Sequence, residues 1–483
     1  MKRAMDRRAF LGGCAAFGCL GFGRAFAAPR DFGTRPRGRL RFGVVSDPHV
    51  TVSLKDGVTT DWRVRAVGRW FERFRDAGVD AVVIPGDLAS FASMRELRAL
   101  MDEWRRVFPD DRLPNGEKVE RVFILGNHDW EGWRYDDFAT RFFPDPDVRK
   151  REILPLDLAN NWRAVFGEDF RPFNVKTVKG YDFVQAHWIG RPDRRDCRGF
   201  DEDCMRGIGE FYANWRPDPR KPFFHVQHPA PKDTCNGRWT WGRDNGDSVR
   251  ALAQFPNAFV LCGHSHYPVT DERSIWQGAF TAVNCGTCSV PTREIPIAGD
   301  GSNAPTESEG RAHVCVKAER ELGYGSGLLI DVCAHEIRIT RLRDWTAVPA
   351  AEDWVVPLGA PRDTPYAFAR RAKAARAPEF PQGAKVALAR TEDGGRQMLK
   401  VSFPKADAVP DARAMEYELV LTASDGGERR LRLLAPGAFK MADDPAAPAE
   451  PSYEIALKAG ERIVQAKVRP YEVFGSCGRF IAS

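Results

Sequence analysis

Five short clusters of carboxylate, amide and imidazole side chains recur along the first part of the chain. In order they are Asp47-Pro48-His49, Gly86-Asp87, Gly126-Asn127-His128-Asp129, His228-Pro229 and Gly263-His264-Ser265-His266. The chain has nine histidines, and five of them fall within these clusters. Histidines that were satisfied one by one in a hydrophobic core would have no reason to gather in this way. We therefore expect these side chains to act together at one site.

The residue types in these clusters predict a site with two divalent metal ions. Carboxylate and imidazole ligands without thiolates suit manganese, iron or zinc. Two such ions lie about 3.5–4 Å apart and repel each other, so a carboxylate and a hydroxide that bridge them are expected. Such a pair can hold a phosphoryl oxygen and deliver the hydroxide in line with the leaving group. The predicted chemistry is the hydrolysis of phosphate esters.

Buried strands are expected to position the clusters. Apolar runs of strand length over 40–46, 79–84 and 119–125 each end at one of the first three clusters. Amphipathic helices capped by Asp61 and Ser93 connect these runs, which gives a βαβαβ unit of the α/β class. Sheets of this kind gather ligands at the carboxyl ends of their strands. Further strand-like runs cover 181–186, 222–227, 258–262 and 279–284, followed by a hairpin over 328–332 and 336–342.

The ordered pattern D-x-H, GD, GNHD, H and GHxH resembles the calcineurin-like metallophosphoesterase superfamily over residues 40–342. The resemblance implies a four-layer α/β/β/α sandwich that binds two divalent metals and hydrolyses phosphate mono- or diesters. It implies that the first metal takes Asp47, His49, Asp87 and His266. The second metal would take Asp87, Asn127, His228 and His264. His128 would be the acid that is not a ligand, and it would either protonate the leaving oxygen or stabilise the developing charge; an imidazole beside the metals suits the role of acid.

Departures from the family patterns reduce the number of subfamilies that the chain resembles. Position 90 is a serine, whereas protein Ser/Thr phosphatases have a carboxylate there and purple acid phosphatases a tyrosine ligand. His128 is followed by Asp129-Trp130-Glu131, which differs from the GNHEFD pattern of 5′-nucleotidases. The chain therefore resembles the broad class that includes phosphodiesterases and nonspecific phosphatases.

Several neighbouring residues have two interpretations. His225 competes with His228 as the isolated ligand, but His228 ends its strand before Pro229 and is preferred. His187 also ends a strand and is either a group near the substrate or a structural histidine. An arginine at 238 or 243 either clamps a phosphate or forms a surface ion pair. Loop tryptophans stack on the substrate or cover a core edge; they are Trp130, Trp133, Trp188, Trp239 and Trp241.

Residues 1–27 are expected to be an export signal. A basic head precedes an apolar stretch, and Ala25-Phe26-Ala27 offers small residues for cleavage. The segment Arg7-Arg8-Ala9-Phe10-Leu11 resembles a twin-arginine signal, although an ordinary signal with incidental arginines is the alternative. The apolar stretch from 10 to 23 is shorter than the ~20 residues of a membrane helix. We expect an exported protein, periplasmic or extracellular, without an integral membrane segment.

Composition argues against a disordered chain and against a nucleic-acid clamp. Hydrophobic residues make up 43% and charged residues 29% of the 483 residues, an ordinary globular mixture. The formal net charge is +6, and five basic residues and one acid lie in the first 27 positions. The remainder has 67 basic against 65 acidic residues, so no nucleic-acid partner is expected.

The chain is expected to hold two domains after the signal. The catalytic domain would cover 40–344, and a segment rich in Pro, Ala and Arg over 345–383 would be a linker with a short helix. Residues 384–483 alternate apolar and polar positions in short runs, which predicts a small β-sandwich. This sandwich resembles fibronectin-like domains of exported bacterial members, and it offers a docking site for a cell-envelope partner. Alternative functions are a nuclease or nucleotide-specific phosphodiesterase of the same fold, or a cell-wall or partner-binding protein with a vestigial site.

Overall fold

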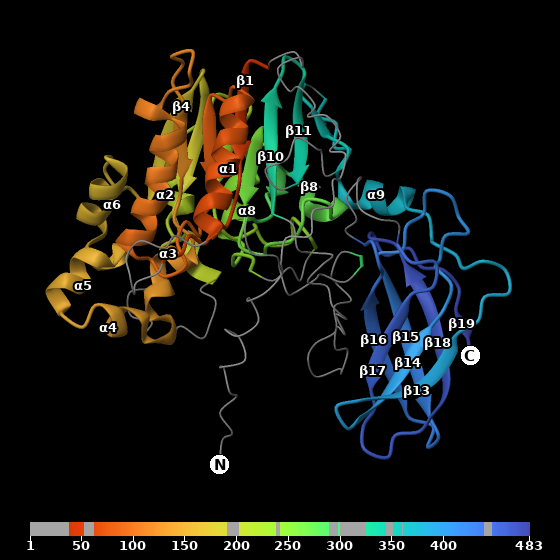
Figure 1. Ribbon diagram of the computed structural model, residues 1–483. Coiled ribbons are helices and arrows are strands. Elements are labelled where there is room, and N and C mark those ends of the chain that lie inside the picture. Colours follow the sequence, from red (N-terminus) through yellow and green to blue (C-terminus); the bar gives the residue numbers. More distant parts are fainter. Residues whose placement is uncertain are drawn as a thin grey trace.

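The computed structural model describes residues 38–52, 62–190, 202–237, 242–288, 298–299, 325–343, 351–359, 361–438 and 447–483. The predicted export signal lies outside these residues. Among the helices that are described, none is both long enough and apolar enough to cross a bilayer. Figure 1 shows a larger α/β body and, beside it, a smaller body made of strands.

The first sheet of the α/β body has the strand order β12-β11-β10-β1-β2-β3. β1, β2 and β3 run parallel, and β10, β11 and β12 continue the sheet antiparallel. Their bounds are Leu40–Val44, Ala81–Ile84, Glu120–Phe123, Ser326–Val332, Glu336–Arg343 and Trp354–Pro357 for β1, β2, β3, β10, β11 and β12. β12 lies within the segment predicted as a linker, and it joins the sheet because Trp354 and Val356 are buried between the sheets.

The second sheet has the order β4-β5-β6-β7-β9-β8. β5, β6, β7 and β9 are parallel, and β4 and β8 are antiparallel edges. The bounds are Phe173–Val178, Tyr181–Ala186, Phe223–Val226, Ala258–Cys262, Ile275–Gln277 and Thr281–Asn284 for β4, β5, β6, β7, β8 and β9. A two-residue turn at 179–180 lets β4 pair with β5.

Three hydrophobic cores separate four layers. α1 (Trp62–Asp76), α2 (Met94–Val107) and α6 (Leu158–Phe166) pack on the outer face of the first sheet. α7 (Ile208–Asn214) and α8 (Asp247–Leu252) cover the second sheet. Between the sheets, the ring of Phe42 lies 5.1 Å from that of Phe183 and 4.7 Å from that of Phe224. The fold is therefore the α/β/β/α sandwich that the resemblance implied (Figure 1).

Short helices complete the α/β body and the connection after it. Ser93 caps α2 as predicted, in a capping box with Glu96. The short α-helices are α3 (Asn127–Glu131), α4 (Phe138–Phe142), α5 (Pro146–Glu152) and α9 (Phe368–Ala374). The 3₁₀-helices are η3 (Pro109–Asp111), η4 (Gly132–Asp137), η5 (Leu154–Asp157), η6 (Glu202–Met205) and η7 (Glu272–Ser274).

The C-terminal body is a β-sandwich. One sheet has the order β13-β14-β17 and the other β16-β15-β18-β19. Bounds for β13 to β19 are Ala387–Asp393, Arg396–Ser402, Glu416–Ala423, Glu428–Leu434, Ser452–Ala456, Ile463–Tyr471 and Ile481–Ala482. The sandwich packs against the α/β body, because Nη2 of Arg273 in η7 lies 3.4 Å from Sδ of Met415. Arg371 of α9, in the connecting segment, lies 4.3 Å from the ring of Phe474. The domain borders themselves stay a prediction.

Candidate metal centre

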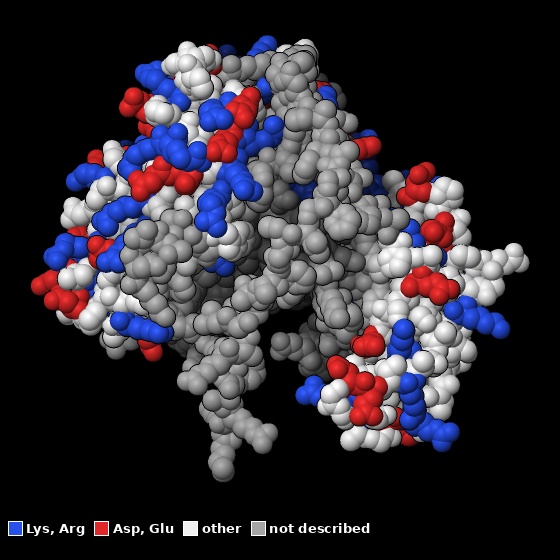
Figure 2. Space-filling view, viewed as in Figure 1, with Lys and Arg blue, Asp and Glu red and all other residues white. Residues whose placement is uncertain are grey.

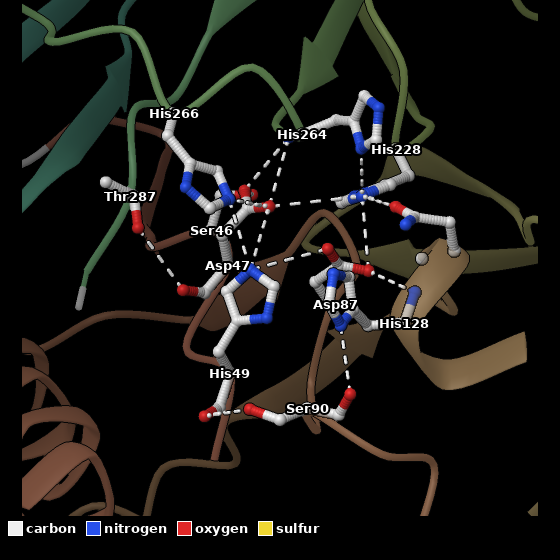
Figure 3. A network of polar contacts seen from close by, with 12 residues as sticks. Ser46, Asp47, His49, Asp87, Ser90, His128, His228, His264, His266 and Thr287 are labelled. Atoms are coloured by element: carbon white, nitrogen blue, oxygen red, sulfur yellow. Dashed lines mark hydrogen bonds and ion pairs between the residues drawn. The ribbon is translucent and has the colours of Figure 1, made fainter. Parts of the chain in front are cut away.

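The predicted site residues lie on loops at the carboxyl ends of strands from both sheets (Figure 3). Backbone hydrogen bonds join the loops that follow β1 and β2, where the amide of His49 donates to the carbonyl of Asp87 at 3.0 Å. The two sheets are joined at Asp47, whose carboxylate accepts from the amide of His264 at 3.0 and 3.2 Å. The structure thus brings together side chains that lie up to 219 positions apart.

The backbone at the site is strained. Five of the seven predicted ligands have positive φ in the left-handed region, which is uncommon for residues other than glycine. They are Asp47, His49, Asp87, His264 and His266, with φ between 44° and 68°. Such conformations cost about 1–3 kcal/mol each and cluster at functional sites. The packing of the surrounding fold must therefore offset the backbone strain of these five residues.

In three of the five clusters, a glycine directly before a site residue makes room for a site side chain. A Cβ at Gly126 would lie 2.1 Å from Oδ1 of Asp87, and one at Gly86 would lie 2.4 Å from Nδ1 of His228. At Gly263, a Cβ would lie 2.3 Å from Oδ2 of Asp47. These separations are shorter than any real carbon contact, so the three glycines are required by the close approach of the ligands.

One group of potential ligand atoms comes from Asp47, His49, Asp87 and His266, all within 4.8 Å of one another. Nε2 of His266 lies 3.0 Å from Oδ1 of Asp47 and 3.1 Å from Nε2 of His49. Nε2 of His49 is also 3.5 Å from Oδ2 of Asp87. This group has the four residues that the resemblance implied for the first metal.

A second group comes from Asp87, His228 and His264. Nε2 of His228 lies 3.1 Å from Nδ1 of His264, 3.1 Å from Oδ1 of Asn127 and 3.3 Å from Oδ1 of Asp87. On its other side, Nδ1 of His228 faces the carbonyl of Pro85 at 2.6 Å, so Nδ1 carries a proton and Nε2 is the ring nitrogen that faces inward. Asp87 belongs to both groups.

The donor atoms at the site fit metal ions. Two imidazole nitrogens 3.1 Å apart cannot both satisfy their lone pairs by a hydrogen bond to each other, whereas one cation satisfies both. Oδ2 of Asp87 is buried and accepts no hydrogen bond within the described part of the chain. An uncompensated buried carboxylate oxygen is costly, and a cation offsets that cost.

The electrostatics of the two groups favour positive charge. Burial opposes ionisation of Asp87, yet His228 and His128 hold the pKa of this carboxyl well below its usual range. Burial lowers the pKa of His228, but Asp87 and Asp47 raise it, and the result is about 9. Burial, with His128 nearby, lowers the pKa of His49 well below its usual value. His49 is therefore a neutral imidazole, the form that binds metals.

His128 lies beside both groups and has its own orienting contacts. Its amide donates to Oδ1 of Asp87 at 2.9 Å, and its Nδ1 lies 2.9 Å from the carbonyl of Ser90. Nδ1 must donate to that carbonyl, which leaves Nε2 to exchange a proton. The serine at position 90 therefore orients His128 through its backbone rather than through a carboxylate side chain. The sequence alone did not reveal this contact.

Asp129, the last residue of the GNHD cluster, is a site residue for which the sequence suggested no role. Its buried carboxylate accepts hydrogen bonds from the amides of Leu88, Ala89 and Gly126 at 2.8–3.0 Å. Burial and Asp87 raise the pKa of Asp129 to about 7, against the effect of these hydrogen bonds. Asp129 ties the loop that carries Asp87 to the loop that carries Asn127. The feature of the sequence that could have identified Asp129 as a site residue is its place at the end of the GNHD cluster.

The structure decides some of the open alternatives. His225 is buried in β6 between the hydroxyl of Tyr212 and the side chain of Gln227, at 2.8 and 2.9 Å, so it is not at the site. His187 is buried too, and its Nδ1 accepts from the amide of Leu125 at 3.1 Å, which is a structural contact at the end of β3. The loop residues at 238, 239 and 241 lie outside the described residues.

Of the three loop tryptophans that lie in the described residues, Trp188 belongs to a hydrophobic core and the other two pack against cores. The ring of Trp188 is fully buried, 5.7 Å from that of His264, so it packs against a ligand. Trp130 packs against hydrophobic cores and is partly buried. Trp133 is also partly buried, and its Nε1 donates to the carbonyl of Trp130. These contacts agree with the interpretation that loop tryptophans cover core edges.

Comparisons with known proteins agree with this geometry. The family model of calcineurin-like phosphoesterases matches residues 40–268. No curated protein sequence matches the chain.

Similar solved structures share little sequence with the chain. A conserved uncharacterized protein from Streptococcus pneumoniae TIGR4, described as a predicted phosphoesterase, is 14% identical with a TM-score of 0.27; the match covers 66% of this chain and 98% of that chain. Vacuolar Protein Sorting 29 from Cryptosporidium parvum is 10% identical with a TM-score of 0.26, over 67% and 98%. Vps29 from Entamoeba histolytica, as a single mutant, is 10% identical with a TM-score of 0.24, over 66% and 100%. The family match over 40–268 shows that this part of the chain is a calcineurin-like phosphoesterase domain.

Proposed function

We propose that the protein hydrolyses phosphate mono- or diesters at a centre that holds two divalent metal ions. The observation that carries this proposal is the position of Asp87, a buried carboxylate that belongs to both groups of potential ligands. Asp47, His49 and His266 would complete the first position, and Asn127, His228 and His264 the second. Manganese, iron and zinc all accept such oxygen and imidazole ligands.

The metals, when bound, would supply positive charge to the phosphoryl oxygens and lower the pKa of a water molecule. Other residues of the protein orient the side chains that would bind the metals. The carbonyl of Pro85 fixes the tautomer of His228, so its Nε2 faces the centre. The carboxylate of Asp129 holds the two loops that carry Asp87 and Asn127 at their mutual distance. The site is thus built before substrate arrives.

His128 would serve the leaving group. Its Nδ1 proton is held by the carbonyl of Ser90, and its ring stands edge-on to that of His49 with the centroids 4.6 Å apart. A proton on Nε2 can therefore pass to the departing oxygen beside the metals, which is general acid catalysis worth about 10²–10⁴ in rate.

The alternatives are less well supported. A vestigial site predicts that ligands are missing, whereas all the predicted ligands converge. A nuclease needs a basic groove, but on the face drawn in Figure 2 the blue and red side chains are interspersed over α1 and α2. On these helices Arg106, for example, pairs with both Glu72 and Glu103. A nucleotide-specific phosphodiesterase is a narrower form of the proposed function.

The test uses the metal-reconstituted full chain against 4-nitrophenyl phosphate and bis(4-nitrophenyl) phosphate, with bound metal measured by elemental analysis. We expect turnover of at least one ester and close to two metal ions per chain. Asp87→Asn should lower the metal content and abolish turnover, because Asp87 belongs to both groups. Wild-type protein that binds no metal under any loading protocol would refute the proposal.

We also propose that residues 1–27 direct export of the folded protein, as the Arg7-Arg8 pair suggests. A chain exported after folding can acquire its metals in the cytoplasm. Replacing both arginines by lysine should leave the protein in the cytoplasm, and cell fractionation measures this. Unchanged export of the variant would favour an ordinary signal.

A further inference from the structure

A tyrosine and a glutamate outside the ligand set lie next to Asn127. Asn127, Glu131 and Tyr135 are spaced four residues apart on α3 and the 3₁₀-helix η4 that follows it. This spacing places side chains on one face of a helix, one above the other. The proposed mechanism assigns no role to Glu131 or Tyr135.

The hydroxyl of Tyr135 connects the other two side chains. It donates to Oε1 of Glu131 at 3.3 Å, and the side chain of Asn127 lies close enough to interact with the same hydroxyl. A phenol has one proton to donate, and Glu131 accepts it. The hydroxyl oxygen must therefore accept from Asn127, and the only donor on that side chain is Nδ2.

The orientation of the Asn127 amide follows from this chain of hydrogen bonds. With Nδ2 turned toward Tyr135, Oδ1 points to the centre, where it lies 3.1 Å from Nε2 of His228. An amide rotated by 180° has nearly the same shape but presents N–H groups in place of the oxygen. N–H groups repel a cation, so only one of the two orientations serves a metal site.

We propose that Glu131 and Tyr135 are positioning residues that hold the Asn127 amide with its oxygen toward the second metal position. This inference rests on the proposed function, since it concerns the same centre. The ring of Tyr135 also lies edge-on to His128, with centroids 5.1 Å apart, so the phenol contacts both residues of the Asn-His pair. Partners that orient ligands in this way typically contribute 10–100-fold to metal affinity or activity.

The test is chelator competition with Mn²⁺ and, separately, Zn²⁺ on the full chain, which resolves the two metal positions by affinity. Tyr135→Phe keeps the ring and removes the hydroxyl, so we expect the affinity of one position to fall 10–100-fold while the other is unchanged. Glu131→Leu should have the same effect. Glu131→Gln should retain the wild-type affinities, because a glutamine oxygen still accepts from the phenol.

Tyr212→Phe is the matched control. The hydroxyl of Tyr212 lies 2.8 Å from Nδ1 of His225, in the core outside the second sheet, so its loss removes a buried hydrogen bond without touching Asn127. We expect this variant to bind both metals as the wild type does. Unchanged metal affinity in Tyr135→Phe, or equal weakening at both positions, would overturn the positioning role. Wild-type protein that binds no metal would instead overturn the proposed function itself.

Discussion

Replacing Gly126 by alanine tests whether the motif glycines exist to admit the ligands. Gly126 has φ −103° and ψ −173°, a conformation that alanine adopts without strain. The only obstacle is contact, because the added Cβ would lie 2.1 Å from Oδ1 and 2.4 Å from the amide nitrogen of Asp87. The substitution therefore acts on Asp87 and not on the backbone preference of position 126.

The expected magnitude follows from these distances. A Cβ does not approach a non-bonded heavy atom closer than 3.0 Å, so Oδ1 of Asp87 must move away from the new Cβ by about 1 Å. A displacement of about 1 Å at a reacting group can lower the rate by 10²-fold. Overpacking of this kind destabilises a protein by about 1–3 kcal/mol. We expect Gly126→Ala to fold, to bind less metal and to lose about 10²-fold in kcat.

The assay measures kcat on 4-nitrophenyl esters, bound metal by elemental analysis and the free energy of unfolding by denaturant. Gly209→Ala is the matched control, because Gly209 lies in α7 with nothing within 4 Å of the added Cβ. That variant should be as active as the wild type and slightly more stable, since alanine favours helix. Full metal content and full kcat in Gly126→Ala would refute the contact argument.

Three further predictions concern neighbouring residues. His128→Ala should keep both metals and lose about 10²–10⁴ in kcat, measured with metal content in parallel; equal activity would contradict its role as acid. Asp129→Asn should destabilise the chain by about 1–3 kcal/mol in denaturant titration, because the single side-chain oxygen of asparagine cannot accept hydrogen bonds from all three backbone N–H groups that the carboxylate binds. An unchanged unfolding midpoint would argue against the structural role of Asp129. Burial, with Lys176 nearby, lowers the pKa of His187 from 6.5 to about 3, so the unfolded chain binds more protons between these values. The contribution of neutral His187 to the free energy of unfolding should be complete above pH 6.5 and should be lost as the pH falls toward 3. His187→Gln should therefore weaken the pH dependence of stability in this range, which thermal unfolding at a series of pH values measures.

The function of the C-terminal sandwich stays a prediction. The sandwich contacts the α/β body, since Arg273 approaches Sδ of Met415 at 3.4 Å and the amide of Ala298 donates to Glu416. A role in docking to a cell-envelope partner would appear as unchanged kinetics with lost localisation after truncation near residue 360.

The ligand set was predictable because the chemistry of the site needs particular residue types in a particular order. Asp87, Asn127 and His228 stood out as polar groups that follow apolar runs. Asp87 and Asn127 follow β2 and β3, which end at a common edge of the first sheet, whereas His228 follows β6 of the second sheet. The choice of His228 over His225 was predictable too, since His225 lies within β6, whereas His228 follows the end of the strand and precedes Pro229. The helix start at Ser93 followed from local hydrogen bonding alone.

Other features depended on residues far apart in sequence. No local pattern shows that the carbonyl of Ser90 orients His128, or that Asp129 accepts three amides from two loops, because backbone groups have no residue identity. β12 paired with the first sheet only because the inter-sheet core accepts Trp354. Residue types and their spacing along the chain thus determined which side chains meet. Only the tertiary structure decided how they are oriented, because orientation depends on backbone carbonyls, amides and packing partners that no side-chain pattern encodes.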